Sequence, residues 1–191
     1  MSRILVSMWT TLDGLVAGPN DEMGWLRGDA QMMAYEQSFV DAAETLMLGR
    51  KTFGDFAGYW PVAARDTAPK VGVEEMQRNY ARRVDAMKKI AVSASGDVAE
   101  WDYTRVLSRI EAEEIGRLKD EAEGDIVIYG SLSVIDALSA LGLIDEYHML
   151  VHPIVLGEGK PMFDKSRPLS LALASVEPFD TGVVLMKYRK G

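Results

Sequence analysis

The segment of residues 125–163 constrains the fold most, because it has the pattern of a strand, a glycine turn, a helix and a second strand. Residues 126–129 are all apolar, as a buried strand requires. Gly130 and Ser131 end this run, helical periodicity follows, and a second strand-like run at 147–151 completes a βαβ unit. Its first turn presents free backbone N–H groups and a helix N-terminus, which favour an anion such as a pyrophosphate. Taken alone, this turn also fits an ordinary strand-to-helix connection.

The size and composition of the chain exclude several classes of protein. Its 191 residues, 48% of them hydrophobic, fit a single domain spanning 1–191 with a substantial core. The net charge of −8 argues against a nucleic-acid or membrane-surface binder, since both need a basic face. There are no cysteines, and hence no disulfides or thiolate metal sites. With no signal peptide or membrane-spanning run, we expect a soluble, cytoplasmic protein that binds a small molecule.

Three predicted strands end in small, basic or hydroxyl-bearing residues. The strands cover 45–48, the first part of 89–96, and 126–129. The residues at their ends are Gly49, Arg50, Lys51 and Thr52; Ser93, Ala94 and Ser95; and Gly130, Ser131, Leu132 and Ser133. Parallel strands of an α/β sheet place their carboxyl ends at one edge, where ligands bind. The three ends together therefore predict a dinucleotide lying across that edge.

The other segments are predicted from periodicity, caps and turn residues. We expect a strand at 4–8, a helix over 29–43 capped by Asp29, a surface loop at 58–72, and a helix over 74–87. A short edge strand within 100–107 precedes a helix for which Ser108 and Glu111 have capping-box spacing. Ser133 and Asp136 have the same spacing in the helix of the βαβ unit. The chain is expected to finish in an antiparallel hairpin that turns at 180–182.

Several blocks of sequence resemble the dihydrofolate reductase superfamily. They are LMLGRKTF at 46–53, IAVS at 90–93 and IVIYGS at 126–131, in this order and spacing. TLDG at 11–14 and the stretch at 145–159 look closer to one branch, the reductase domain of the bifunctional deaminase–reductase of riboflavin synthesis and its stand-alone relatives. The resemblance implies an α/β, dihydrofolate reductase-like three-layer fold: a mixed, mostly parallel central sheet, helices on both faces and a C-terminal antiparallel hairpin. It also implies NADPH as cofactor and a homodimer.

The same resemblance implies roles for individual residues. Arg50, Lys51 and Thr52 would contact the cofactor phosphates, with Arg50 at the 2′-phosphate that distinguishes NADPH from NADH. The other predicted cofactor contacts are Ser93, Ala94 and Ser95 on the adenosine side; Gly130, Ser131, Leu132 and Ser133 at the pyrophosphate; Trp9, Val16 and Ala17 near the nicotinamide; and Gly49 and Tyr129. For Trp9, a core indole is an equally good interpretation.

Departures from the two known patterns concern the substrate. The position of the acid that binds the pteridine in dihydrofolate reductases falls on Met33, and Glu36, one helical turn on, is a candidate substitute. The riboflavin reductases have an acidic residue before the glycine turn, where this chain has Ile128. Residues 32–43 contain no Lys or Arg to hold a substrate phosphate. The cofactor pattern is therefore retained and the substrate pattern is not.

These observations predict an NADPH-dependent reductase of a small conjugated heterocycle, pterin- or pyrimidine-like. Trp25, Met33 and Phe53 are expected in the substrate pocket, together with Trp9 and Tyr129. Asp13, Glu36, Tyr129 or a water could donate the proton, and the sequence does not choose among them.

The alternative is a non-catalytic module that binds NADPH or a related nucleotide as a sensor or scaffold. His148 and His152 have the spacing of a helical metal site, but they fall on a strand. We therefore expect ordinary histidines there and no metal.

Overall fold

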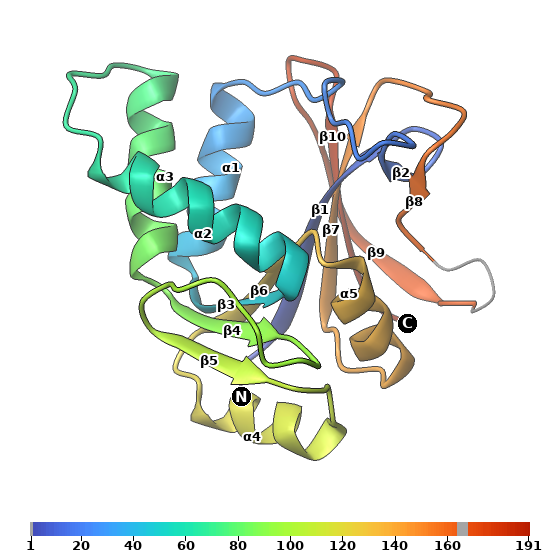
Figure 1. Ribbon diagram of the computed structural model, residues 1–191. Helices are drawn as coiled ribbons and strands as arrows, with labels where there is room; N and C mark the ends of the chain where they lie inside the picture. Colours follow the sequence, from blue (N-terminus) through green and yellow to red (C-terminus); the bar gives the residue numbers. More distant parts are fainter. Residues whose placement is uncertain (1, 164–167) are drawn as a thin grey trace.

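An eight-stranded sheet forms the centre of the computed structural model, which describes residues 2–163 and 168–191 (Figure 1). The strand order is β5-β4-β3-β6-β1-β7-β10-β9. In that order the bounds are Thr104–Leu107, Lys88–Val92, Ala43–Gly49, Asp125–Tyr129, Ile4–Thr11, Glu146–His152, Val184–Lys190 and Leu171–Pro178. The first six strands in this order, from β5 across to β7, pair in parallel with their neighbours. Strand β10 runs antiparallel to both β7 and β9. The predicted mixed, mostly parallel sheet with a C-terminal antiparallel hairpin is therefore confirmed.

Helices cover both faces of this sheet. On one face lie α1 (Ala30–Asp41), α2 (Arg50–Arg65) and α3 (Val73–Ala86), and on the other α4 (Ala112–Glu121) and α5 (Leu132–Ala140) (Figure 1). The alternation of β1 builds both halves of the core. Ile4, Val6 and Met8 pack in the cluster of α4 and α5, whereas Leu5 packs in the cluster of α1, α2 and α3. Strand β1 is therefore the central element from which both layers are organised.

The predicted βαβ unit is present as β6, α5 and β7, but its helix begins differently from the prediction. The N-cap of α5 is Ser131, whose side chain makes no capping bond, so the predicted box of Ser133 and Asp136 does not form. Gly130 and Ser131 have φ values of 53° and 54°, in the left-handed region. This sharp turn starts α5 directly after β6, before the hydroxyl–carboxylate pair. The Ser108–Glu111 box is also wrong, because α4 begins at Ala112 behind an N-cap, Glu111, without a side-chain bond.

The predicted loop at 58–72 is wrong over its first half. Helix α2 continues through Pro61 to Arg65, and only 66–72 connects it to α3. Proline within a helix removes one backbone hydrogen bond. Tertiary packing offsets this loss: the Trp60 ring lies 5.8 Å from Phe56 and 5.0 Å from Tyr80 of α3. Packing of the Trp60 ring therefore supports the continuation of α2 past Pro61.

Smaller elements complete the fold. A second sheet pairs β2 (Leu15–Ala17) with β8 (Lys160–Pro161) in antiparallel fashion. The predicted cap of α1 is confirmed, since the Asp29 side chain accepts a 2.8 Å hydrogen bond from the Met32 backbone N–H. Within the described ranges 2–163 and 168–191, no helix combines the length and hydropathy that crossing a membrane would require.

Candidate active site

A cavity of about 1050 Å³ opens at the carboxyl ends of the parallel strands. Residues 49–52, 93–94 and 129–133 line it, so the three predicted strand ends meet at one site. The cavity continues along β1 to Ser7 and Trp9. It therefore extends from the edge of the sheet down between the sheet and α1.

Two helix N-termini face this cavity and are linked to each other. Gly49, the N-cap of α2, donates its backbone N–H to Ser131 Oγ at 2.9 Å. Ser131, the N-cap of α5, donates its backbone N–H to Thr52 Oγ1 at 3.2 Å. A Cβ on Gly130 would lie 3.1 Å from Thr52 Cγ2, and the φ of 53° is left-handed, so both crowding and backbone conformation favour glycine at this turn. Neither helix has a side-chain cap, and the free N–H groups of two first turns suit a phosphate or pyrophosphate.

Three cations line the mouth of the cavity. They are Arg50, Lys51 and Lys160. Asp21, on the loop between β2 and α1, pairs with Lys51 at 2.7 Å and also with Lys160. Hydrogen bonds from Lys160 and then Lys51 lower the pKa of Asp21 to about 2. Three cations against the carboxylates of Asp21 and Asp55 leave the mouth basic. The ion pairs described for its lysines go to Asp21, which is half-exposed and which an anionic ligand could displace.

Glu36 is the buried acid of the cavity. It lies on α1 and is only 3% exposed. Its Oε1 accepts a hydrogen bond from Trp9 Nε1 and its Oε2 one from Tyr129 Oη, both at 2.9 Å. Burial raises the pKa of Glu36 from 4.5 to about 7, although both hydrogen bonds oppose the rise. The group is therefore poised to hold or release a proton near neutral pH.

Apolar side chains form the inner wall of the cavity. They come from α1, α2 and α3, and they are Met32, Met33, Phe56, Trp60 and Tyr80. A wall of thioethers and aromatic rings fits a flat conjugated ligand and excludes water from the region around Glu36.

Most of the residues predicted for the site lie on the cavity wall. They are Trp9, Val16, Ala17, Met33, Glu36, Gly49, Arg50, Lys51, Thr52, Ser93, Ala94, Tyr129, Gly130, Ser131, Leu132 and Ser133. Lining residues that sequence reasoning missed include Ser7 and Lys160, and the inner-wall rings of Phe56, Trp60 and Tyr80. Ser7 could have been found from the alternation of β1, because Ser7 and Trp9 point to the same side of the sheet.

Four predicted residues lie elsewhere, which corrects their placement. Phe53 is fully buried behind the cavity, its ring 5.6 Å from Trp101. The Trp25 ring lies against His152 at 5.1 Å. The remaining two hold loop segments in place. Asp13 accepts a hydrogen bond from Thr11 Oγ1 and one from the Gly157 backbone N–H, and Ser95 lies 3.3 Å from Ser93 Oγ and bonds the Asp97 backbone N–H.

The two histidines are structural within the described part of the chain. His148 contacts Tyr35 and Glu146, and both ring nitrogens of His152 face backbone carbonyls. No group of three or more metal-binding side chains occurs among the residues that the structure describes.

Comparison with known proteins gives relatives along the whole chain. The uncharacterized protein YyaP of Bacillus subtilis (strain 168) is 31% identical over 187 residues, covering 97% of this chain and 94% of that protein. A dihydrofolate reductase from Enterococcus faecalis, solved with NADP(H), has a similar structure with a TM-score of 0.64 and 14% identity, covering 99% of this chain and 96% of that one.

A Thermotoga maritima diaminohydroxyphosphoribosylaminopyrimidine deaminase/5-amino-6-(5-phosphoribosylamino)uracil reductase is also similar, with a TM-score of 0.67 and 15% identity. It covers 100% of this chain, which spans 57% of that longer protein. At such identities the two solved structures establish the dihydrofolate reductase-like fold. The family model described as the RibD C-terminal domain matches residues 2–185. With nearly every residue covered, the chain belongs to the RibD C-terminal domain family.

Proposed function

We propose that the protein is an NADPH-dependent reductase of a small conjugated heterocycle, pterin- or pyrimidine-like. One observation carries the proposal: a single cavity joins a phosphate-compatible mouth to a buried acid whose pKa lies near 7. The reductase domain of the Thermotoga relative and the dihydrofolate reductase neighbour support it by likeness. Hydride transfer needs both a bound dinucleotide and a nearby proton, and the two halves of the cavity suit these needs.

The residues at the mouth fit NADPH. The first turns of α2 and α5 would bind the pyrophosphate through their N–H groups, with Thr52 between them. Arg50, which is exposed and carries a planar guanidinium, would bind the 2′-phosphate. Ser93 and Ala94 would contact the adenosine. Val16 and Ala17 would lie at the nicotinamide through backbone groups. When bound, NADPH supplies the hydride.

Glu36 would hold the proton that accompanies the hydride. At pH 7 a group with a pKa of about 7 is partly protonated, and Trp9 and Tyr129 fix the positions of both its oxygens. A heterocycle against the inner wall would receive the proton on a ring nitrogen, directly or through one water. Asp13 lies outside the cavity, bonded to Thr11 and Gly157, and we do not propose it as the donor.

The substrate would carry no phosphate of its own. The cations that line the cavity within the described residues all lie at the mouth, where the cofactor phosphates would use them. Away from these cations the lining is mostly apolar, and its polar side chains, such as Ser7, Glu36 and Gln77, carry no positive charge. A phosphorylated substrate would have to bury its charge there without a partner, which is costly.

The cofactor site is tested by charge reversal at Arg50. We expect Arg50→Glu to weaken NADPH binding by about tenfold or more while changing NADH binding little, because only NADPH carries the 2′-phosphate. The affinities are measured by nicotinamide fluorescence. Arg65→Glu, at the far end of the same helix, is the matched control and should leave both affinities unchanged. Equal losses for the two nucleotides would contradict the assignment.

Catalysis is tested by consumption of NADPH with a panel of pterins, aminopyrimidines, flavins and quinones. Turnover that is lost in Glu36→Gln, with NADPH binding retained, is the expected result. Tight NADPH binding without consumption of any compound would instead favour the non-catalytic sensor or scaffold.

We also propose, by likeness to the family, a homodimer and a cytoplasmic location. The outer strand β9 leaves Leu173 57% and Val176 50% exposed, and such an apolar edge suits a contact between two copies. Light scattering at micromolar concentration measures the mass, and a monomer there would refute the dimer.

A further inference from the structure

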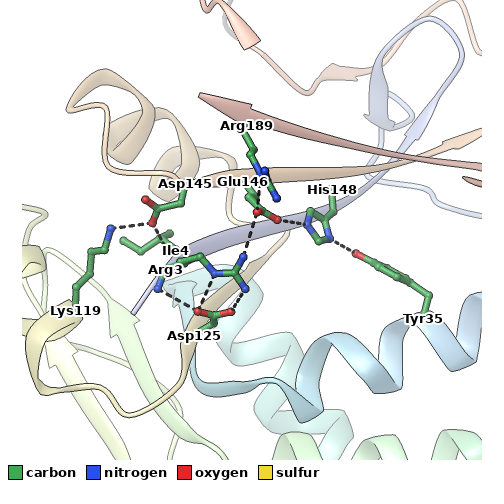
Figure 2. A network of polar contacts seen from close by, with 9 residues as sticks. All are labelled: Arg3, Ile4, Tyr35, Lys119, Asp125, Asp145, Glu146, His148 and Arg189. Carbon is green, nitrogen blue, oxygen red and sulfur yellow. Dashed lines mark hydrogen bonds and ion pairs between the residues drawn. The ribbon is translucent and has the colours of Figure 1, made fainter. Parts of the chain in front are cut away.

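A chain of hydrogen bonds runs from a charged cluster at the amino ends of the parallel strands toward the cavity, and Figure 2 shows it as far as Tyr35. Its anchor is Glu146, the first residue of β7, which is buried. Glu146 Oε1 accepts hydrogen bonds from Arg3 Nη1 and from Arg189 Nε, both at 3.1 Å. Its other oxygen, Oε2, lies 3.1 Å from His148 Nε2. Two guanidinium groups and one imidazole thus surround a single carboxylate.

The hydrogen-bond chain continues from His148 to the wall of the cavity. His148 Nδ1 lies 2.9 Å from the hydroxyl of Tyr35, which projects from α1 (Figure 2). The same hydroxyl lies 3.2 Å from Ser7 Oγ. Ser7 and His148 are paired residues of the adjacent strands β1 and β7, so the sheet fixes their spacing. Ser7 lines the cavity, as does Glu36, the residue after Tyr35.

The charged end of this hydrogen-bond chain, Glu146, determines which atom donates in each of its bonds. Burial alone would raise the pKa of Glu146, but the bonds from His148 and Arg189 and the charge of Arg3 hold it below its ordinary value. Glu146 is therefore ionised and can only accept, which forces His148 Nε2 to carry a hydrogen. Burial lowers the pKa of His148, so the ring is neutral at pH 7 and its Nδ1 is an acceptor.

The remaining two bonds are then determined. Tyr35 must donate to His148 Nδ1, and because burial raises the pKa of Tyr35 well above its ordinary value, it keeps that proton. Since its one hydrogen is used, the Tyr35 oxygen accepts, and Ser7 must donate to it. Lys187, opposite His148 on β10, places Nζ 5.7 Å above the Tyr35 ring, and its charge further disfavours a protonated His148.

We propose that Ser7 Oγ is a specificity-determining hydrogen-bond acceptor in the cavity, and that Tyr35, His148 and Glu146 are positioning residues that orient its hydroxyl. With its hydrogen directed away toward Tyr35, Ser7 presents only lone pairs to a ligand. The cavity therefore selects a heterocycle that turns an N–H or NH₂ group toward Ser7 and disfavours one that turns a carbonyl or ether oxygen there. This deepens the proposed function, on which it rests for the identity of the cavity as the substrate site.

The proton order is tested first, without ligand or activity. The protein has two histidines, so ¹⁵N-histidine labelling gives a spectrum of two rings from which each tautomer is read. We expect one ring, identified by its change in Tyr35→Phe, to be neutral with the hydrogen on Nε2 at about pH 7.5. In Glu146→Gln this fixed tautomer should be lost. A doubly protonated His148, or one with its hydrogen on Nδ1, would reverse the chain and overturn the proposal.

The selectivity is tested with two neutral probes of similar size, 2-aminopyrimidine, which has an NH₂ donor, and 2-methoxypyrimidine, which has only acceptors. Ligand-observed NMR titrations, with and without NADPH, measure both affinities. We expect the wild-type protein to favour the amino compound by about tenfold, the usual size of one well-made hydrogen bond plus the avoided mismatch. Ser7→Ala and Tyr35→Phe should reduce the preference to within about twofold.

Tyr103→Phe is the matched control, because Tyr103 is 72% exposed and lies outside the chain of bonds. It should keep the wild-type preference. A wild-type protein without preference, or a preference that survives in Ser7→Ala, would overturn the proposal. Failure of the proposed function is separate: it would appear as absent NADPH binding or turnover, whereas the histidine tautomer and the probe ratio would still be measured.

Discussion

Replacement of Glu36 by glutamine should make the protein more stable at neutral and alkaline pH. Glutamine has the shape of the protonated acid, and it can accept from Trp9 Nε1 while donating to the Tyr129 oxygen. The wild-type carboxyl must instead ionise in a buried site as the pH rises. The substitution therefore removes a penalty that the folded protein alone carries.

The size of the effect follows from the raised pKa. Below pH 4.5 the carboxyl is protonated in both the folded and the unfolded chain, so wild type and variant should be equally stable. As the pH rises, the unfolded chain loses its proton near 4.5 and the folded chain only near 7, which lowers the free energy of unfolding across that window. One pH unit is worth about 1.4 kcal/mol, so the loss reaches ~3 kcal/mol. Above about pH 7 the difference between Glu36→Gln and wild type should level off.

The assay is urea unfolding of both proteins at intervals from about pH 4.5 to about pH 8.5. The difference in free energy should grow from near zero to ~3 kcal/mol, equivalent to about 6–12 °C in Tm for a chain of this length. Titrations shared by the two proteins cancel in the difference. Asp41→Asn, exposed on the same helix, is the control and should shift stability by less than about 0.5 kcal/mol at every pH. Parallel curves for Glu36→Gln and wild type would refute the argument that Glu36 is buried with a raised pKa.

Two further predictions concern the mouth of the cavity. Gly130→Ala should cost ~2–3 kcal/mol and weaken NADPH binding, because it adds a clash with Thr52 to the left-handed strain, whereas Gly14→Ala, with φ of 78° and open space around it, should cost only ~1 kcal/mol. If urea unfolding gave equal losses of stability for Gly130→Ala and Gly14→Ala, the inferred crowding at Gly130 would be contradicted. Asp21→Asn should tighten NADPH binding by about threefold at low salt by freeing the two lysines, a gain that fluorescence titration should find absent at high salt. A gain independent of salt would contradict the electrostatic cause.

The cofactor half of the site could be predicted because it depends on strand ends. A glycine or hydroxyl residue after an apolar run marks where a parallel strand stops, and the sheet itself brings such ends together. Residues 49–52 and 130–133 therefore lie on one cavity although about eighty positions separate them along the chain. No long-range information was needed beyond the rule that parallel strands share an edge.

The substrate half depends on packing that the sequence does not show. Counting along the family pattern places Met33 at the position of the expected acid, but residues three apart share a helix face, so Glu36 reaches the same cavity. Phe53 shows the opposite case. It follows Thr52 directly, and the rotation of about 100° per helical residue turns it into the core against Trp101. The apolar character of Phe53 predicted that its side chain is buried, but not whether it points into the cavity or into the core.

One contact between α1 and β1 places both polar groups of the inner cavity. Neighbouring residues of the helix, Tyr35 and Glu36, bond to alternate residues of the strand, Ser7 and Trp9. Because the two strand residues point to the same side, the acid and the oriented hydroxyl must lie side by side above the sheet. A displacement of α1 along β1 would break both bonds at once, so the proton-holding group and the selective acceptor are coupled through one interface. The N-cap Asp29 secures the start of that helix and thus contributes to the positions of both groups without contacting either.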